Sequence, residues 1–239
     1  MQKRIAMSGA FAAVVSAVKA RLSREGREWF DAALSPDCLS NIHELLSNYT
    51  AASRRAGMEP LAADAATRSS LNSLRAGLSC ERWTVADGAR AALLLALSEV
   101  KPTADEWVAD ATECFENGDA REQQSWLRAI SLMPHRERLV SIAIDACRSH
   151  IQPLFESIAC ENPYPADYFS EGQFNQLVLK AMFTGVRLER IAGLARRLNP
   201  DLSRMARDYA AERRAAGRSV PADIALALDG TPELEGHLS

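Results

Sequence analysis

The sequence of 239 residues predicts an all-α fold in which antiparallel helix pairs form a right-handed stack, HEAT-like or tetratricopeptide-like, with an irregular helical bundle as the alternative. Apolar residues recur with the 3.6-residue period of a helix through most of the chain. The alternation of apolar and polar residues that marks a half-buried strand is almost absent. From Thr84 onward, helix starts recur every 13 to 19 positions, so that helix pairs would repeat about every 35 residues.

The first 80 residues predict less regular helices. At ~100° per residue, the apolar residues of a first helix fall on one face and its polar residues on the opposite face. The apolar face holds Met7, Phe11, Val14, Val15, Val18 and Leu22, and the polar face holds Ser8, Ser16 and Lys19. This pattern favours a packed amphipathic helix over a cleaved export signal, which the basic start and the small residues would also allow. Ser35 before Pro36 predicts another helix start, and residues 58–80 predict one weak helix followed by a loop.

The remainder of the chain predicts a regular series of helices, which begin at Thr84, Thr103, Asp119, His135, Ile151, Ser170, Val186 and Asn199. Gln173 completes a capping box with Ser170, and Pro200 follows Asn199 at the first helical position. Glycines just past periodic segments predict helix ends at Gly57, Gly118, Gly185 and Gly217. The segment NPYPADYF, residues 162–169, has the composition of a loop.

These elements predict a single all-α domain over residues 1–230. Its less regular part covers residues 1–80, and its helical-repeat core covers residues 84–228. No stretch between them has the length and composition of a linker between independent domains. Residues 231–239 are expected to form a disordered tail.

Composition excludes several classes of function. A net charge of −3 and an isoelectric point near 5.9 give no general attraction to nucleic acid, and no run approaches the length of a membrane-spanning helix. Five cysteines without a CxxC pair indicate reduced thiols and a cytoplasmic location. The motifs of nucleotide-binding enzymes, zinc proteases, serine hydrolases and calcium loops are absent, so we predict no cofactor and no catalytic residue.

A metal site receives little support from the sequence. The best candidate pair is Cys147 and His150, spaced i,i+3 on one helix, with Cys114 or Cys160 as a third ligand. Cys147 falls on the apolar face, where a small core residue is expected, and structural zinc sites need four ligands. We therefore predict no metal.

The segment from Lys180 to Arg218 is basic, with ten Lys or Arg and four Asp or Glu, a balance of +6 against −3 for the whole chain. A basic concave surface there would bind a phosphate, a carboxylate or an acidic partner. For four of these residues we favour a simpler interpretation, that they form the solvent-exposed face of a helix, RLERIAGLARR: Arg187, Arg190, Arg196 and Arg197.

Helical geometry separates the polar residues of FNQLVLKAMFTG, residues 174–185. Asn175 falls inside the apolar arc, whereas Gln176 and Lys180 lie on a narrow polar strip. The same construction places Arg213 in the middle of the apolar face of the last helix. A buried Asn or Arg needs a hydrogen-bonding partner, so these residues predict either a hydrogen-bond network between helices or a binding pocket.

Several motifs resemble the EboA-domain family. They include WTVADGARAALLLAL, NPYPA, the pattern FNQ.VLKA.F and the helix end ERRAAGR, and the likeness extends over residues 82–224 and more weakly before them. The segment Ser149-His150-Ile151 departs from the family pattern, which argues against His150 as a functional residue. The resemblance implies an accessory protein of bacterial gene clusters for secondary-metabolite production or export, with no established catalytic activity.

Our leading hypothesis is a non-catalytic helical-repeat protein that binds a small metabolite or a pathway enzyme. The candidate binding residues are Asn175, Lys180, Arg213, Arg148, Glu212 and Asn162. One alternative is an enzyme acting on a prenylated or polyol metabolite, with Lys180 or Glu212 as acid or base. The other is a structural scaffold whose polar residues only hold the helices together.

Overall fold

The structure, a computed structural model, describes residues 2–101 and 103–228. Within these ranges all regular structure is helical, and strand-like pairing is limited to one bridge between Pro60 and Thr84. The all-α prediction is confirmed. The tail predicted to be disordered, residues 231–239, lies outside the described residues. No helix in the described ranges is long and apolar enough to cross a membrane.

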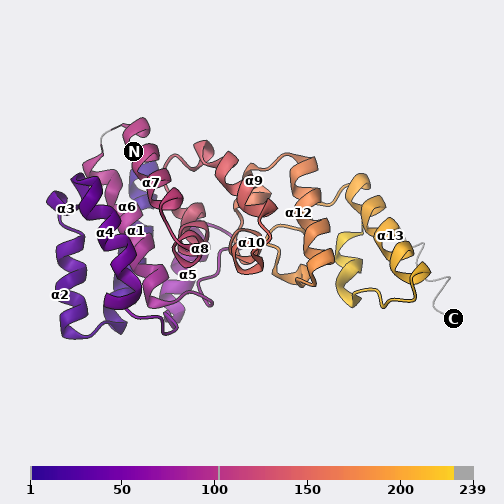
Figure 1. Cartoon of the computed structure of the whole chain (residues 1–239), viewed down its shortest axis with the longest axis horizontal. Helices are drawn as coiled ribbons and strands as arrows, with labels where there is room; N and C mark the ends of the chain where they lie inside the picture. Colours follow the sequence, from indigo (N-terminus) through magenta and orange to yellow (C-terminus); the bar gives the residue numbers. More distant parts are fainter. Residues whose placement is uncertain (1, 102, 229–239) are drawn as a thin grey trace.

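The helices of the first half are α1 (Gln2–Arg21), α2 (Arg24–Ala33), α3 (Pro36–Ser40), α4 (Ile42–Arg55), α5 (Ala65–Leu74), α6 (Val85–Val100), α7 (Ala104–Glu116) and α8 (Ala120–Ala129). They form a block at one end of the molecule (Figure 1). The amphipathic first helix is confirmed, since Val14, Val18 and Leu22 are buried. The weak helix expected within residues 58–80 is α5.

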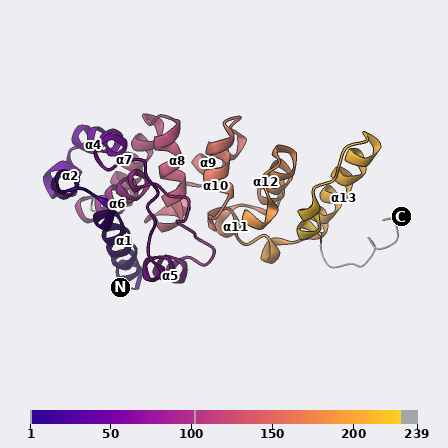
Figure 2. The same cartoon turned by 90° about the horizontal axis from the view of Figure 1, so that it is seen from below.

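The second half contains α9 (Val140–Arg148), α10 (Gln152–Ala159), α11 (Tyr164–Tyr168), α12 (Glu171–Thr184) and α13 (Pro200–Ala215). Short 3₁₀ turns precede α9, connect α12 to α13 and follow α13. They are η1 (Ile130–Leu132), η2 (Arg136–Arg138), η3 (Leu188–Arg190), η4 (Ala195–Arg197) and η5 (Ala222–Ala227). Helices α9 and α10 lie side by side, and α12 and then α13 follow them along the longest axis of the molecule, in both views (Figures 1 and 2).

Helix α6 lies at the centre of the N-terminal block. Every residue from Val85 to Leu97 is buried, and the helix packs against α1, α3, α4 and α8. Its start is fixed by a capping box, in which Thr84 accepts from the backbone of Asp87 and the Asp87 carboxylate accepts from the backbone of Thr84. The Ala and Leu side chains of ADGARAALLLAL can be surrounded on all sides because they carry no polar groups.

Gly88 allows α1 and α6 to approach closely. A Cβ atom at this position would lie 2.6 Å from Cγ2 of Val18 on α1 and 3.3 Å from Leu61. Alanine ordinarily stabilises a helix by about 1 kcal/mol over glycine. Here we expect Gly88→Ala to lower the free energy of unfolding by about 1–2 kcal/mol, because overpacking costs more than the helix gains.

Denaturation with urea measures this prediction, and Gly172→Ala is its control. Gly172 is also helical, but a Cβ atom there meets nothing within 4 Å. The control should leave stability unchanged or raise it by about 0.5 kcal/mol. Stabilisation by both substitutions would contradict the close approach of α1 and α6.

Most predicted caps are confirmed. Thr84, Thr103, Asp119 and Ser170 each form a capping box, and Asn199 caps α13. The segment predicted as a loop, residues 162–169, contains the short helix α11. His135 adopts a left-handed backbone and is followed by the 3₁₀ turn η2, so that α9 begins only at Val140.

The helix predicted from Val186 is wrong. Residues 186–198 form two 3₁₀ turns, η3 and η4, separated by Gly193 at φ 79°. A Cβ atom on Gly193 would lie 2.7 Å from that of Ala166, so this glycine permits both the left-handed turn and a close approach to α11. The apolar residues Leu188, Ile191 and Leu194 are buried at three-residue spacing, which suits 3₁₀ turns as well as an α-helix.

Candidate functional site

A groove of about 510 Å³ lies between α9 and α12. We call it the α9–α12 groove, and its lining residues are Ile144, Cys147, Arg148, His150, Phe169, Gly172, Gln173, Gln176, Leu177 and Lys180. The volume falls within the range of about 300–1,000 Å³ typical of small-molecule sites. Two of the predicted binding residues, Lys180 and Arg148, meet in this groove.

Local sequence features hold the two walls of the groove in place. The capping box of Ser170 and Gln173 begins α12, and Gly185 at φ 72° ends it. On the other wall, α9 ends at Arg148, and the chain turns through Ser149 and His150 into α10. Helix α10 packs against both α9 and α12. It therefore fixes the separation of the two walls.

Lys180 joins the walls at one end of the groove. Its Nζ donates to the carbonyl oxygens of Cys147 at 2.6 Å and Ser149 at 2.7 Å, where α9 ends. The ammonium also lies over the ring of Phe155, 4.6 Å from its centroid. Burial lowers the pKa of Lys180. Two hydrogen bonds to carbonyl oxygens and a cation–π contact all favour a charged ammonium with a positioning role, not a free amine that acts as a base.

The groove combines an apolar floor with a polar, basic rim. Phe169 and Leu177 are buried beneath it, whereas Arg148, His150 and Gln176 are exposed at its edges. No acidic residue lines it, although Arg148 forms an exposed ion pair with Asp145 at 3.0 Å. Such a lining suits a molecule with an apolar body and a polar end that accepts hydrogen bonds.

The thiol of Cys147 is not a reactive group in this groove. Burial raises the pKa of Cys147 to about 12, so the thiol is protonated at neutral pH. The proposed i,i+3 pairing of Cys147 with His150 on one helix is wrong, because α9 ends at Arg148 and His150 lies beyond it. Among the described residues no group of three or more His, Cys, Asp or Glu is placed to hold a metal ion.

Asn175 lies on the other side of α12, away from the groove. It is buried, as predicted, and its partner is Asn199, the cap of α13. The two amides bond reciprocally, with Asn175 Nδ2 donating to Asn199 Oδ1 at 3.1 Å and Asn199 Nδ2 donating to Asn175 Oδ1 at 3.0 Å. This pair belongs to the packing of α12 against α13.

Asn162 is buried and engages both ends of its amide. Its Nδ2 donates to the carbonyls of Leu127 and Ser157, and its Oδ1 accepts from the Ser131 hydroxyl at 2.6 Å and from the backbone of Tyr164. It therefore ties α8 and α10 to α11. Its side chain has no vacant acceptor or donor to offer a ligand.

Arg213 and Glu212 lie on α13, outside the α9–α12 groove. The prediction of a buried Arg213 is wrong, since the side chain is half-buried and donates to the carbonyl of Ser219 at 2.9 Å. Its guanidinium also lies 6.0 Å from the ring centroid of Tyr209. Glu212 is exposed. An arginine can cover an apolar face with its methylene groups while its guanidinium reaches water. The angular position of a residue on a helix does not distinguish this arrangement from full burial of the side chain.

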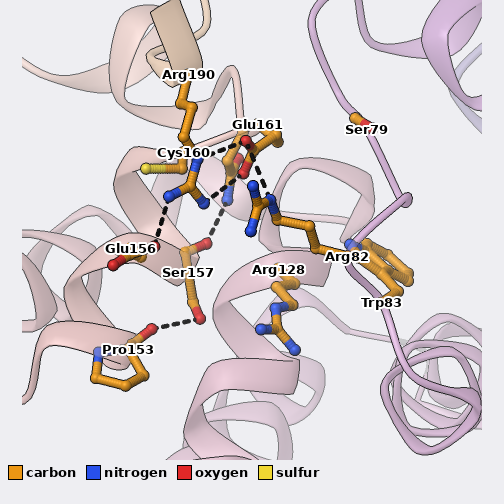
Figure 3. Close-up of a pocket in the computed structure, with 11 residues that line it drawn as sticks. Ser79, Arg82, Trp83, Arg128, Pro153, Glu156, Ser157, Cys160, Glu161 and Arg190 are labelled. Atoms are coloured by element: carbon orange, nitrogen blue, oxygen red, sulfur yellow. Dashed lines mark hydrogen bonds and ion pairs between the residues drawn. The ribbon is translucent and has the colours of Figure 1, made fainter. Parts of the chain in front are cut away.

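A second hollow, of about 270 Å³, lies between α8, α10 and two connecting segments (Figure 3). We call it the charged pocket, because its lining includes Arg82, Arg128, Glu156, Glu161 and Arg190. In Figure 3 the Arg190 side chain reaches between Glu156 and Glu161, Arg82 approaches Glu161 from the facing side, and Arg128 lies further away from these three. None of these five residues was among the predicted binding residues, although Asn162, which was, also lines the pocket.

Arg190 is held firmly by two carboxylates. Its Nε and Nη2 donate to the two oxygens of Glu161 at 2.7 and 3.0 Å, and its Nη1 donates to Glu156 at 2.6 Å. Hydrogen bonding to Glu161 and Glu156 raises the pKa of Arg190. The expectation that Arg190 and Arg197 are solvent-exposed helix residues is wrong, since both are partly buried and Arg197 donates to the carbonyls of Ala166 and Phe169.

Glu161 joins three parts of the chain at this pocket. Its backbone is left-handed, at φ 52°, which is uncommon for a residue other than glycine and costs of order 1 kcal/mol. The conformation is secured by hydrogen bonds from Ser79 N to Glu161 O and from Glu161 N to Arg190 O, at 3.0 and 2.8 Å. These bonds bring residues 79–83 and 188–190 to the end of α10.

A buried carboxylate stands behind Arg128. Asp87 Oδ2 accepts from Arg128 Nη1 at 2.6 Å and from the Thr84 backbone and hydroxyl, and Oδ1 accepts from Ser125 at 2.6 Å. Arg128 is thereby fixed in direction. The sequence does carry a signal for this network, since Asp87 is a charged residue within an otherwise apolar stretch, but its distant partners are not visible in the sequence.

Comparison with known proteins identifies the family. Searches of curated proteins and of solved structures find no match. A family model described as "Metabolite traffic protein EboA" matches residues 11–229, which is more of the chain than the motifs alone covered. This match spans nearly the whole chain and shows that the protein belongs to the EboA family.

Proposed function

We propose that this protein is a non-catalytic, cytoplasmic accessory protein that binds a small metabolite in the α9–α12 groove. The observation that carries the proposal is the groove itself, an apolar floor closed at one end by Lys180 and edged by Arg148, His150 and Gln176. The metabolite would place its apolar body on Phe169 and Leu177 and a polar, acceptor-bearing end toward the basic rim. The family description, metabolite traffic, is compatible with this role.

Binding is favoured over catalysis by the state of the titratable groups in the groove. The Cys147 thiol has a pKa of about 12, and the Lys180 ammonium is engaged by two carbonyl oxygens. Neither group is set up to exchange a proton or to attack a substrate at neutral pH. We further propose that α9, α10, α12 and α13 act as a HEAT-like stack, in which a groove between successive layers is the natural place for a ligand.

Filling the α9–α12 groove should weaken the binding of a small molecule there. Gln176 is exposed on the rim, so Gln176→Trp adds bulk over the floor without disturbing the core. We expect a fluorescent probe with an apolar body and a sulfonate, 8-anilinonaphthalene-1-sulfonate, to bind the wild type with a Kd at least about tenfold lower than it binds Gln176→Trp, a difference of about 1.4 kcal/mol. Fluorescence titration measures both constants.

The matched control is Glu171→Trp, which adds the same side chain to an exposed position of α12 that does not line the groove. It should bind the probe like the wild type. Equal affinity of all three proteins would show that the probe binds elsewhere and would contradict the proposed site. Loss of binding in both variants would point to a general effect of tryptophan on α12.

A further inference from the structure

We propose that the charged pocket is a second binding site, specific for the phosphoryl group of a small molecule, which binds between Arg82 and Arg128. The pocket shares no lining residue with the α9–α12 groove, so this inference is independent of the proposed function. The inference rests on three observations: which arginine N–H groups in the pocket already have an acceptor, how the arginine side chains are held in place, and how much space lies next to them.

The three arginines differ in the donors that they have left. Arg190 uses three of its N–H groups on Glu156 and Glu161. Within the described ranges, Arg128 donates only through Nη1, to Asp87, and Arg82 makes only a 3.6 Å ion-pair contact with Glu161. Arg82 and Arg128 therefore keep most of their five guanidinium N–H groups for another acceptor, whereas Arg190 keeps only two.

Arg128, which lines the pocket, is held in place by a buried carboxylate. Asp87 is 3% exposed and receives four hydrogen bonds, from the Thr84 backbone and hydroxyl, the Ser125 hydroxyl and Arg128. A carboxylate held in this way fixes the Nη1 end of the Arg128 guanidinium, and within the described residues no other hydrogen bond of this guanidinium is found. The side chain is one quarter exposed, at 25%, which is consistent with one free edge.

The donor set suits a phosphoryl group better than a carboxylate. One guanidinium edge is enough for a carboxylate, as Arg190 and Glu161 show. Two free guanidinium groups, with the Ser79 hydroxyl also in the lining, can serve the three acceptor oxygens of a phosphoryl group. The body of the ligand has room beside it, because an adjoining open hollow shares Arg82, Glu161 and Arg190 with the pocket and adds the ion pair of Arg187 and Glu189.

Charge balance sets the expected affinity. Arg82, Arg128 and Arg190 are offset by Asp87, Glu156 and Glu161, so the site has no excess charge to attract anions over a distance. Affinity must come from directed hydrogen bonds. For inorganic phosphate, which lacks the body of the ligand, we expect a Kd on the order of 10 mM.

Thermal unfolding with inorganic phosphate tests the site. At 50 mM phosphate, compared with sodium chloride of equal ionic strength, we expect the Tm of the wild type to rise by about 2–4 °C. Sodium acetate at the same ionic strength should give no such rise. Arg82→Ala should remove the rise specific to phosphate while leaving the Tm in chloride unchanged, because the Arg82 side chain is 64% exposed and makes one long contact.

Arg24→Ala is the matched control, since Arg24 is 92% exposed and pairs only with Glu28 on its own helix. It should respond to phosphate like the wild type, and this comparison also removes the general stabilisation that phosphate gives to any folded protein. An equal response of wild type and Arg82→Ala, or no response of the wild type, would overturn the site. An equal response to acetate and phosphate would overturn the assignment to a phosphoryl group.

Discussion

Arg90→Ala is expected to lower the free energy of unfolding by about 3–5 kcal/mol, the range found when one partner of a buried ion pair is removed. The Arg90 side chain is 2% exposed, and its guanidinium donates to the Tyr49 carbonyl at 2.9 Å, to Ser53 at 2.9 Å and to Ser125 at 3.1 Å. It also lies 3.6 Å from the buried carboxylate of Glu122. Alanine would leave that carboxylate without its cation and open a cavity beside α6.

Urea denaturation followed by circular dichroism measures this loss. Arg24→Ala again serves as the control and should change stability by less than about 0.5 kcal/mol, since exposed pairs within a helix contribute little. Arg90→Lys should fall between the two, because it keeps the charge but loses the planar donor edge. A loss below about 1 kcal/mol for Arg90→Ala would contradict the network that joins α4, α6 and α8.

Asn175→Leu is expected to lower the free energy of unfolding by about 2–3 kcal/mol. The substitution removes two hydrogen bonds between α12 and Asn199 and leaves the Asn199 amide with fewer partners in a buried place. Asn199 also caps α13 by accepting from the backbone of Leu202 at 2.9 Å. The loss should therefore loosen α13, the last helix in the row.

A double-mutant cycle isolates the pair. Asn175→Ala and Asn199→Ala should show a coupling energy of about 1–2 kcal/mol, because each removes the other's partner. Gln176→Ala, one residue along α12 but exposed, should change stability by less than about 0.5 kcal/mol. Independent effects of the two asparagines would argue that their amides do not meet.

The local elements of this fold could be predicted from the sequence because their signals are local. Thr84, Thr103, Asp119 and Ser170 each cap the helix that follows them, and a capping side chain accepts from a backbone N–H group only two or three residues further along the chain. The burial of Asn175 followed in the same way from its angular position on α12.

The interruption of residues 186–198 could not be predicted from periodicity. Buried residues at positions 188, 191 and 194 fit an α-helix and a pair of 3₁₀ turns equally well. The difference is decided by tertiary contacts, the packing of Gly193 against Ala166 and the bond from Leu188 N to Asp223 at 2.7 Å. Both partners are more than 25 residues away in the sequence.

The candidate sites, like the fold, could be predicted from the sequence only where the signal is local. Lys180 was recognised as a polar interruption of an apolar helix, and it does line a groove together with Arg148. The charged pocket was missed apart from Asn162, because Arg82, Arg128 and Arg190 lie on three segments that are distant in the sequence. The backbone bonds of Ser79, Glu161 and Arg190 and the packing of α8 against α10 bring these segments together. A composition that is acidic overall gave no indication of it.

The most direct test of the central claim, that the α9–α12 groove holds a small metabolite, is native mass spectrometry of the protein purified from its own host. We predict that the wild type and Glu171→Trp carry one additional mass of a small molecule, and that Gln176→Trp carries none. The same additional mass on Gln176→Trp, or no additional mass on the wild type, would contradict the claim.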